Sequence, residues 1–196
     1  MQANQALKEF EAAEAILKGH FILSSGLHSD TYMQCARVLM DTARAERLCG
    51  ALAAKVVVQF GKDAFDLVVA PAMGGVVVGY EMARQLRLPS IFCERENGQF
   101  TFRRGFEVPP GARVLIIEDV VTTGKSSIET IACVEALGGR VVAEASLVNR
   151  NKGVNPLPIP LVSLLELEIG TYTEDKLPPA LAAMPAIKPG SRFLKK

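Results

Sequence analysis

The sequence predicts an α/β fold in which a parallel twisted sheet of about five strands has helices on both faces. Short apolar runs alternate along the chain with helical patterns, in the order β-α-β-α-β. These runs are continuously apolar, which is typical of parallel strands buried on both faces. With 196 residues, the chain is long enough for one domain with its own core. We therefore expect a single domain over residues 1–196, with a core at about 41–150 and a small hood from about 1–35 and 151–196.

The elements can be placed in chain order from residue spacing and from turn-forming residues. Apolar side chains at helical spacing predict a helix over 3–18, and we expect extended segments over 20–25 and 31–40. Asp41 suits the N-cap of a helix over 42–60 that ends at Gly61. Further along, the patterns predict strands at 66–70, 90–93, 113–119 and 140–148, helices at 76–87 and 126–137, and a loop or two-stranded ribbon at 95–112. The tail from 151, which holds seven of the eleven prolines, is expected to form a less regular accessory lobe.

Charge and cysteine composition exclude several classes of protein. The chain has 22 Lys+Arg and 21 Asp+Glu, and a net charge of +1 provides no overall basic field for nucleic acid or an anionic membrane. No apolar run is long enough to span a bilayer, and the first residues lack the apolar segment of a signal peptide. The four cysteines have no CxxC spacing, so we expect buried thiols in a reducing cytoplasm rather than a zinc site.

The most informative segment for chemistry is 114–127, VLIIEDVVTTGKSS. An apolar strand leads directly into two carboxylates, Glu118 and Asp119, and a Thr/Gly-rich turn then begins a helix. Ligands of open parallel sheets lie beyond the carboxyl ends of the strands. A helix N-terminus with nearby hydroxyl groups can hold a phosphate, and the acids can accept hydrogen bonds from a sugar attached to that phosphate.

Gly124, Lys125 and Ser126 also match the end of a nucleotide-binding P-loop. That motif requires a glycine five positions earlier, where this chain has Asp119. A carboxylate at that position would repel a triphosphate. The sequence therefore argues against an NTPase.

The motif EDVVTTGKS resembles the ribose-phosphate-binding signature of the type I phosphoribosyltransferases, and the chain is most similar to the orotate phosphoribosyltransferases. FILSSGLHSDTY, APAMGG, LVNR and KPGSR extend the resemblance over roughly 16–150 and 187–192. The resemblance implies the type I phosphoribosyltransferase fold. It also implies transfer of the 5-phosphoribosyl group from 5-phosphoribosyl pyrophosphate (PRPP) to orotate, which gives orotidine 5′-monophosphate and pyrophosphate in pyrimidine biosynthesis.

The resemblance implies roles for individual residues. Glu118 and Asp119 would hold the ribose hydroxyls and favour the positive charge that develops on the ring. The 5′-phosphate would be bound by Val120, Val121, Thr122, Thr123, Gly124, Lys125 and Ser126. The pyrophosphate would be bound by a loop of Ala72, Met73, Gly74 and Gly75, and a mobile loop at 95–107 would add Arg95, Arg103 and Arg104 as catalytic clamps. Orotate would contact Ser24, Ser25, Gly26, Thr122 and Arg150. The guanidinium of Arg150 would bind the orotate carboxylate through two parallel hydrogen bonds.

The resemblance also implies partners. Mg²⁺ is expected through PRPP and water, with no direct protein ligand, and a homodimer with shared active sites is expected. Two alternatives stay open. The first is a phosphoribosyltransferase for another base, such as a purine, which would not need a carboxylate partner like Arg150. The second is a non-catalytic PRPP-binding regulator, because the loop at 95–107 contains no lysine or histidine.

Overall fold

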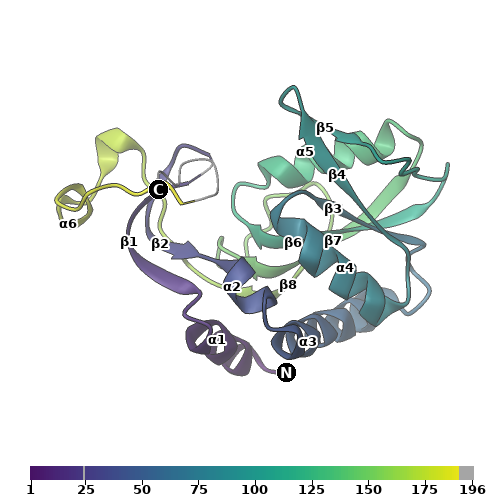
Figure 1. Cartoon of the computed structure of the whole chain (residues 1–196), viewed down its shortest axis with the longest axis horizontal. Coiled ribbons are helices and arrows are strands. Elements are labelled where there is room, and N and C mark those ends of the chain that lie inside the picture. Colours follow the sequence, from purple (N-terminus) through teal and green to yellow (C-terminus); the bar gives the residue numbers. More distant parts are fainter. Residues whose placement is uncertain (24, 190–196) are drawn as a thin grey trace.

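A six-stranded sheet flanked by helices forms the centre of the molecule (Figure 1). The structure is a computed structural model that describes residues 1–23 and 25–189. The sheet comprises β3 (Leu67–Pro71), β4 (Ser90–Glu96), β5 (Gln99–Phe102), β6 (Arg113–Val121), β7 (Arg140–Asn149) and β8 (Leu161–Glu166) in the order β5-β4-β3-β6-β7-β8. Neighbouring strands are parallel except β4 and β5, which form an antiparallel ribbon at one edge. The predicted parallel sheet is therefore confirmed.

Helices cover both faces of this sheet, as the continuously apolar strands predict. On one face, α3 (Thr42–Phe60) and α4 (Gly74–Leu86) contribute Leu52 and Met82 to a cluster that includes Ile117 of β6. On the other face, α5 (Lys125–Glu135) contributes Val134 to a cluster that includes Ile116. Successive residues of β6 thus serve opposite faces of the core. The described residues include no helix long and apolar enough to cross a membrane.

The first forty residues differ from the prediction in two places. The helix expected over 3–18 is α1 (Ala3–Ala12), because the chain turns at Glu14, which has a left-handed φ of +49°. It then enters β1 (Ile16–Ile22), which pairs antiparallel with β2 (His28–Met33). The extended segment expected over 31–40 ends at Met33, and α2 (Cys35–Leu39) follows. A helical turn buries the three apolar side chains of Cys35, Val38 and Leu39 together.

The tail beyond residue 150 is divided between two parts of the fold. Its apolar run forms β8 and completes the central sheet beside β7. Farther along, η1 (Glu174–Lys176) and α6 (Pro179–Ala182) lie with the β1–β2 pair, through bridges that join His28 to Tyr172 and Phe21 to Ile187. Figure 1 shows this second group (β1, β2 and residues 172–187) to one side of the sheet; it is smaller than the expected hood, because β8 belongs to the sheet, and we use the name hood for it from here on. Residues 190–192 of the KPGSR segment lie outside the described residues, and the division into core and hood stays a prediction.

Candidate active site

The ends of β3 and β6 bring the predicted pyrophosphate loop against the two acids. The strands are parallel neighbours, so both point their carboxyl ends at the same edge of the sheet. A Cβ on Gly74 would lie 2.9 Å from both carboxylate oxygens of Asp119, and a Cβ on Gly75 would lie 3.2 Å from Oε2 of Glu118. Only glycine permits this approach between the first turn of α4 and the acids. Met73, the N-cap residue of α4, is largely exposed beside them.

Glu118 and Asp119 form an electronegative pair at the end of β6. Their hydrogen bonds are to backbone groups: Oε2 of Glu118 accepts from the Asp119 N–H at 3.3 Å, and Oδ1 of Asp119 accepts from the Val120 N–H at 2.8 Å. Burial raises the pKa of Glu118 well above its usual range, and the charges of Asp119 and Glu144 raise it further. Burial also raises the pKa of Asp119. Such carboxylates are suited to accept hydrogen bonds from ligand hydroxyls or to face a cationic group.

The predicted phosphate turn is a strand-turn-helix unit, as the sequence indicates. Val120 and Val121 end β6, Gly124 adopts a left-handed φ of +73°, and α5 begins at Lys125. Thr122 and Ser126 are half-buried, whereas Thr123 and Lys125 are exposed. The first N–H groups of α5 have no partners within the helix, so this end of α5 is a suitable anion site.

The connection from β7 to β8 packs against this turn and forms a hydrogen bond with it. Nδ2 of Asn151 donates a hydrogen bond to the backbone oxygen of Thr122 at 2.6 Å. A Cβ on Gly124 would lie only 2.6 Å from a methyl carbon of Leu157. Sequence reasoning did not identify Asn151 or Leu157, because no local pattern shows that residues near 155 pack on the turn near 123.

Arg150 connects the sheet to the hood. The Arg150 N–H donates to the Val121 oxygen at 3.0 Å, and the guanidinium donates to Oγ of Ser29 at 2.8 Å. The side chain is 6% exposed, and its Nε has no hydrogen-bond partner among the described residues. Burial lowers the pKa of Arg150. The structure therefore brings Arg150 to the end of β6 next to Thr122, with its Nε donor unpaired among the described residues.

Tyr32 of β2 is a second residue that sequence reasoning missed. It is half-buried, and its pKa is raised by burial and by the charge of Asp119, while the charge of Arg150 acts in the opposite direction. The hydroxyl therefore lies within the electrostatic reach of both the acid pair and the arginine. The sequence places Tyr32 inside FILSSGLHSDTY but gives no sign of which way it faces.

The predicted Ser25 and Gly26 lie in the exposed turn between β1 and β2. The hydrogen bonds of this turn are local: Oγ of Ser25 accepts from the Leu27 N–H at 3.4 Å, and the Gly26 N–H donates to the Leu23 oxygen at 2.9 Å. No hydrogen bond among the described residues joins either residue to Arg150 or Thr122. Ser24 lies outside the described residues.

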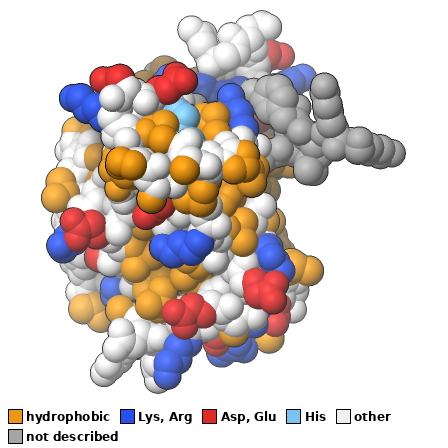
Figure 2. Space-filling view, turned by 90° about the vertical axis from the view of Figure 1, so that its left-hand side faces the viewer, with side chains coloured by type: hydrophobic (Ala, Val, Ile, Leu, Met, Phe, Trp, Pro, Cys, Tyr) orange, Lys and Arg blue, Asp and Glu red, His pale blue; other side chains and the backbone are white. Residues whose placement is uncertain are grey.

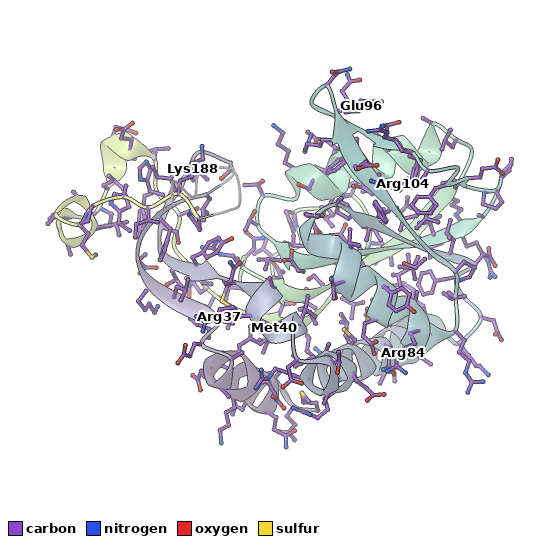
Figure 3. The ribbon with its side chains drawn as sticks, viewed as in Figure 1. Arg37, Met40, Arg84, Glu96, Arg104 and Lys188 are labelled. Carbon is purple, nitrogen blue, oxygen red and sulfur yellow. The ribbon has the colours of Figure 1, made fainter. Side chains whose placement is uncertain are left out.

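The three predicted clamp arginines lie on the β4–β5 ribbon, each paired with a carboxylate. Arg95 pairs with Glu129 of α5, Arg103 with Glu96 at 3.6 Å, and Arg104 with Glu94 at 3.2 Å. Figure 3 shows Glu96 near the tip of the ribbon and Arg104 near its base. The segment is thus a ribbon rather than an open loop. In the described structure these arginines contact neighbouring acids rather than the Glu118–Asp119 pair.

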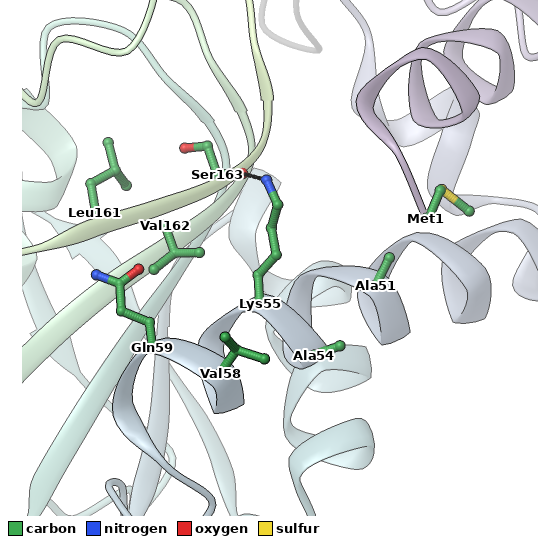
Figure 4. Close-up of a pocket in the computed structure, with 9 residues that line it drawn as sticks. All are labelled: Met1, Ala51, Ala54, Lys55, Val58, Gln59, Leu161, Val162 and Ser163. Carbon is green, nitrogen blue, oxygen red and sulfur yellow. Dashed lines mark hydrogen bonds between the residues drawn. The ribbon is translucent and has the colours of Figure 1, made fainter.

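One pocket of the structure adjoins the candidate site residues, and another lies apart from them. One of about 390 Å³ includes Arg150, Asn151 and Gly170 in its lining and therefore adjoins the site. Another of about 480 Å³ lies between α3 and β8, where Nζ of Lys55 donates to the Ser163 oxygen (Figure 4). That second pocket is lined by none of the predicted site residues. Figure 2 shows acidic and basic side chains interspersed on one face of the molecule, in keeping with the balanced charge.

Comparison with known proteins identifies the family. Residues 38–173 match the family model described as a phosphoribosyl transferase domain. Orotate phosphoribosyltransferase of Sphingopyxis alaskensis is 58% identical over 98% of both chains, and that of Maricaulis maris is 53% identical over 99% of this chain and 100% of its own. The crystal structure of orotate phosphoribosyltransferase from Aeropyrum pernix superposes with a TM-score of 0.67 at 27% identity and covers 82% of this chain and 93% of its own. The chain therefore belongs to the phosphoribosyl transferase family and, within it, to the orotate phosphoribosyltransferases.

Proposed function

We propose that the protein transfers the 5-phosphoribosyl group from PRPP to orotate and releases pyrophosphate. The observation that carries this proposal is the meeting of three features at one sheet edge: the acid pair on β6, the glycine-rich start of α4 and the phosphate turn before α5. PRPP has three matching parts, which are a ribose diol, a pyrophosphate and a 5′-phosphate. The full-length similarity to orotate phosphoribosyltransferases supports orotate as the acceptor.

In this proposal Glu118 and Asp119 accept hydrogen bonds from the ribose hydroxyls. As the bond between C1 and the pyrophosphate breaks, positive charge develops on the ring and the nearby carboxylates stabilise it. The backbone N–H groups at the start of α5 hold the 5′-phosphate, with Thr122, Thr123 and Ser126 supplying hydroxyls. The start of α4, from Met73 to Gly75, offers backbone N–H groups to the leaving pyrophosphate.

Arg150 is the proposed partner of the orotate carboxylate. Its partner-free Nε and its burial beside Thr122 support this role, since a buried guanidinium gains most from a carboxylate. Ser25 and Gly26 are also part of the proposed base site. This role requires the β1–β2 turn to move toward Arg150 when orotate binds. Arg95, Arg103 and Arg104 would exchange their present carboxylate partners for the pyrophosphate.

Mg²⁺ is the proposed cofactor, bound through PRPP and water. The chemistry of the donor set fits, because Glu118 and Asp119 are half-buried at the end of β6 and carry oxygen donors of the kind that Mg²⁺ prefers, which would hold the ion through water and the ribose hydroxyls. The ion would neutralise charge on the pyrophosphate.

A homodimer with shared sites is also part of the proposal. Met40, Met73, Val77 and Tyr80 are large apolar side chains that are each more than half exposed. They lie after α2 and along α4, next to the proposed pyrophosphate loop, where a second subunit could cover them. We also place the protein in the cytoplasm, because its four cysteines are free thiols.

The test is an assay of purified protein with PRPP and Mg²⁺ against orotate, uracil, hypoxanthine and adenine. We expect loss of orotate absorbance and formation of orotidine 5′-monophosphate, with at least about 100-fold lower turnover of the other bases, since a buried arginine is left without its carboxylate. Preferred turnover of a purine would favour the alternative transferase. PRPP binding without turnover of any base would favour the regulator.

A further inference from the structure

A completely buried carboxyl group lies behind the phosphate turn and has no role in the proposed chemistry. Glu144 of β7 is 0% exposed. Its Oε1 accepts a hydrogen bond from Oγ of Ser127 at 2.7 Å, whereas its Oε2 has no partner among the described residues. A buried carboxylate with one neutral donor and no cation is poorly stabilised. The side chain is therefore most stable as the protonated, neutral carboxylic acid.

Within residues 1–23 and 25–189, the elements around Glu144 offer no compensating charge. On β6 its register partner is Ile116, and the nearest acid along that strand is Glu118. On β8 its register partner is Leu161. On α5 the nearby charged residues are the exposed Lys125 and the half-buried Glu129, and Glu129 is already paired with Arg95. Burial raises the pKa of Glu144 to about 7.

Ser127 links this carboxyl group to the phosphate turn. It is the third residue of α5 and is 2% exposed. The N–H groups of the first three helical residues have no partners within the helix, and they are the donors proposed for the 5′-phosphate. The hydrogen bond to Glu144 fixes the side chain of one of these three residues.

We propose that Glu144 is a positioning residue for the 5′-phosphate of PRPP, acting through Ser127 as a neutral carboxylic acid, and that loss of its proton weakens PRPP binding. This inference rests on the proposed function, because the phosphate is that of PRPP. A dianionic phosphate at the start of α5 and an ionised carboxylate behind the first turn repel each other across a poorly solvated interior. By linkage, bound PRPP favours the protonated form of Glu144 to the same extent.

The test compares PRPP binding by wild type, E144Q and E144L from pH 6 to pH 8.5 by calorimetry. E135Q is the matched control, because Glu135 is an exposed acid at the far end of the same helix. Ionisation of the phosphate itself is common to all proteins, so the informative quantity is the ratio of wild-type to variant Kd. We expect this ratio to rise about 5-fold or more across the range for E144Q and E144L, and to stay constant for E135Q. Free pyrophosphate, which binds at the other loop, should give a constant ratio for every variant.

A wild-type measurement keeps the test independent of variant folding. At pH 8, where the phosphate is fully ionised, PRPP binding in buffers of different ionisation enthalpy should show net proton uptake. A constant Kd ratio in the variants, or no proton uptake by wild type, would overturn the role of Glu144. Failure of wild type to bind PRPP at any pH would instead contradict the proposed function itself.

Discussion

Gly74 approaches Asp119 so closely that a Cβ on Gly74 would lie 2.9 Å from both oxygens of the Asp119 carboxylate. The predicted pyrophosphate loop and the acid pair are therefore in direct contact, although Gly74 and Asp119 are 45 positions apart in the sequence. The start of α4 and the end of β6 cannot adjust independently. Changes on either side should affect the same chemical step.

The Gly74→Ala substitution tests this contact. The added methyl group must displace either the Asp119 carboxylate or the first turn of α4, so kcat/KM should fall by about 10- to 100-fold, as expected for a displacement near 1 Å in an active site. Steady-state kinetics with PRPP and orotate would measure it. Gly50→Ala is the matched control, because a Cβ there meets only the end of the flexible Gln85 side chain at 3.4 Å. Equal activity of the two variants would contradict the proposed geometry.

Arg150→Lys tests the proposed orotate site. Lysine keeps the charge but removes the planar fork, so the KM for orotate should rise by about 10-fold or more while the KM for PRPP changes little. Arg140→Lys, at the exposed start of β7, the strand that precedes Arg150, is the control and should leave both constants unchanged. An equal rise in both KM values would show that Arg150 supports the fold rather than the base.

Arg103→Gln tests the role of the ribbon. The side chain is about half exposed and pairs only with Glu96 at 3.6 Å, so its removal should not change the melting temperature. If Arg103 clamps the pyrophosphate, kcat should fall by about 10-fold. Arg37→Gln removes a comparable exposed ion pair with Glu14 and should leave kcat unchanged. Full activity of R103Q would remove Arg103 from the catalytic residues.

Glu144 should make the folded state less stable as pH rises. Its folded pKa of about 7 lies above the ordinary value of 4.5, so the folded state binds the proton more tightly than the unfolded state. The stabilisation is fully present below about pH 4.5 and is lost as pH rises to 7. Between these limits the unfolding free energy of wild type relative to E144Q should fall by up to about 3 kcal/mol. Urea denaturation of both proteins at several pH values would measure it, and parallel curves would refute the shift.

Much of the sheet could be predicted because its signals are local. The continuous apolar runs of β3 and β6 and the breaks after them define strands without reference to distant residues. The prediction of an extended segment over 31–40 was wrong at its second half. Val38 and Leu39 can be buried from a strand or from a helix, and packing against the core determines which of the two forms. The position of β8 in the main sheet depends on pairing with β7, which no local pattern shows.

The candidate site likewise contains residues that the sequence could predict and residues that it could not. Glu118, Asp119 and the phosphate turn are contiguous in sequence, so the motif itself indicates their chemistry. Tyr32, Asn151 and Glu144 were missed because each reaches the site through a contact between distant segments. The carboxylate partners of the ribbon arginines were also not predicted, since they depend on how β4 and β5 pair and, for Arg95, on how the ribbon packs against α5.

The measurement that tests the central claim most directly is the comparison of wild type with Asp119→Asn for orotate turnover and PRPP binding. Asparagine keeps the size of the side chain but removes the negative charge that is proposed to stabilise the ring as pyrophosphate leaves. Turnover should fall by about 100-fold or more, while calorimetry still detects PRPP. Undiminished turnover by D119N, or no orotate turnover by wild type, would contradict the account.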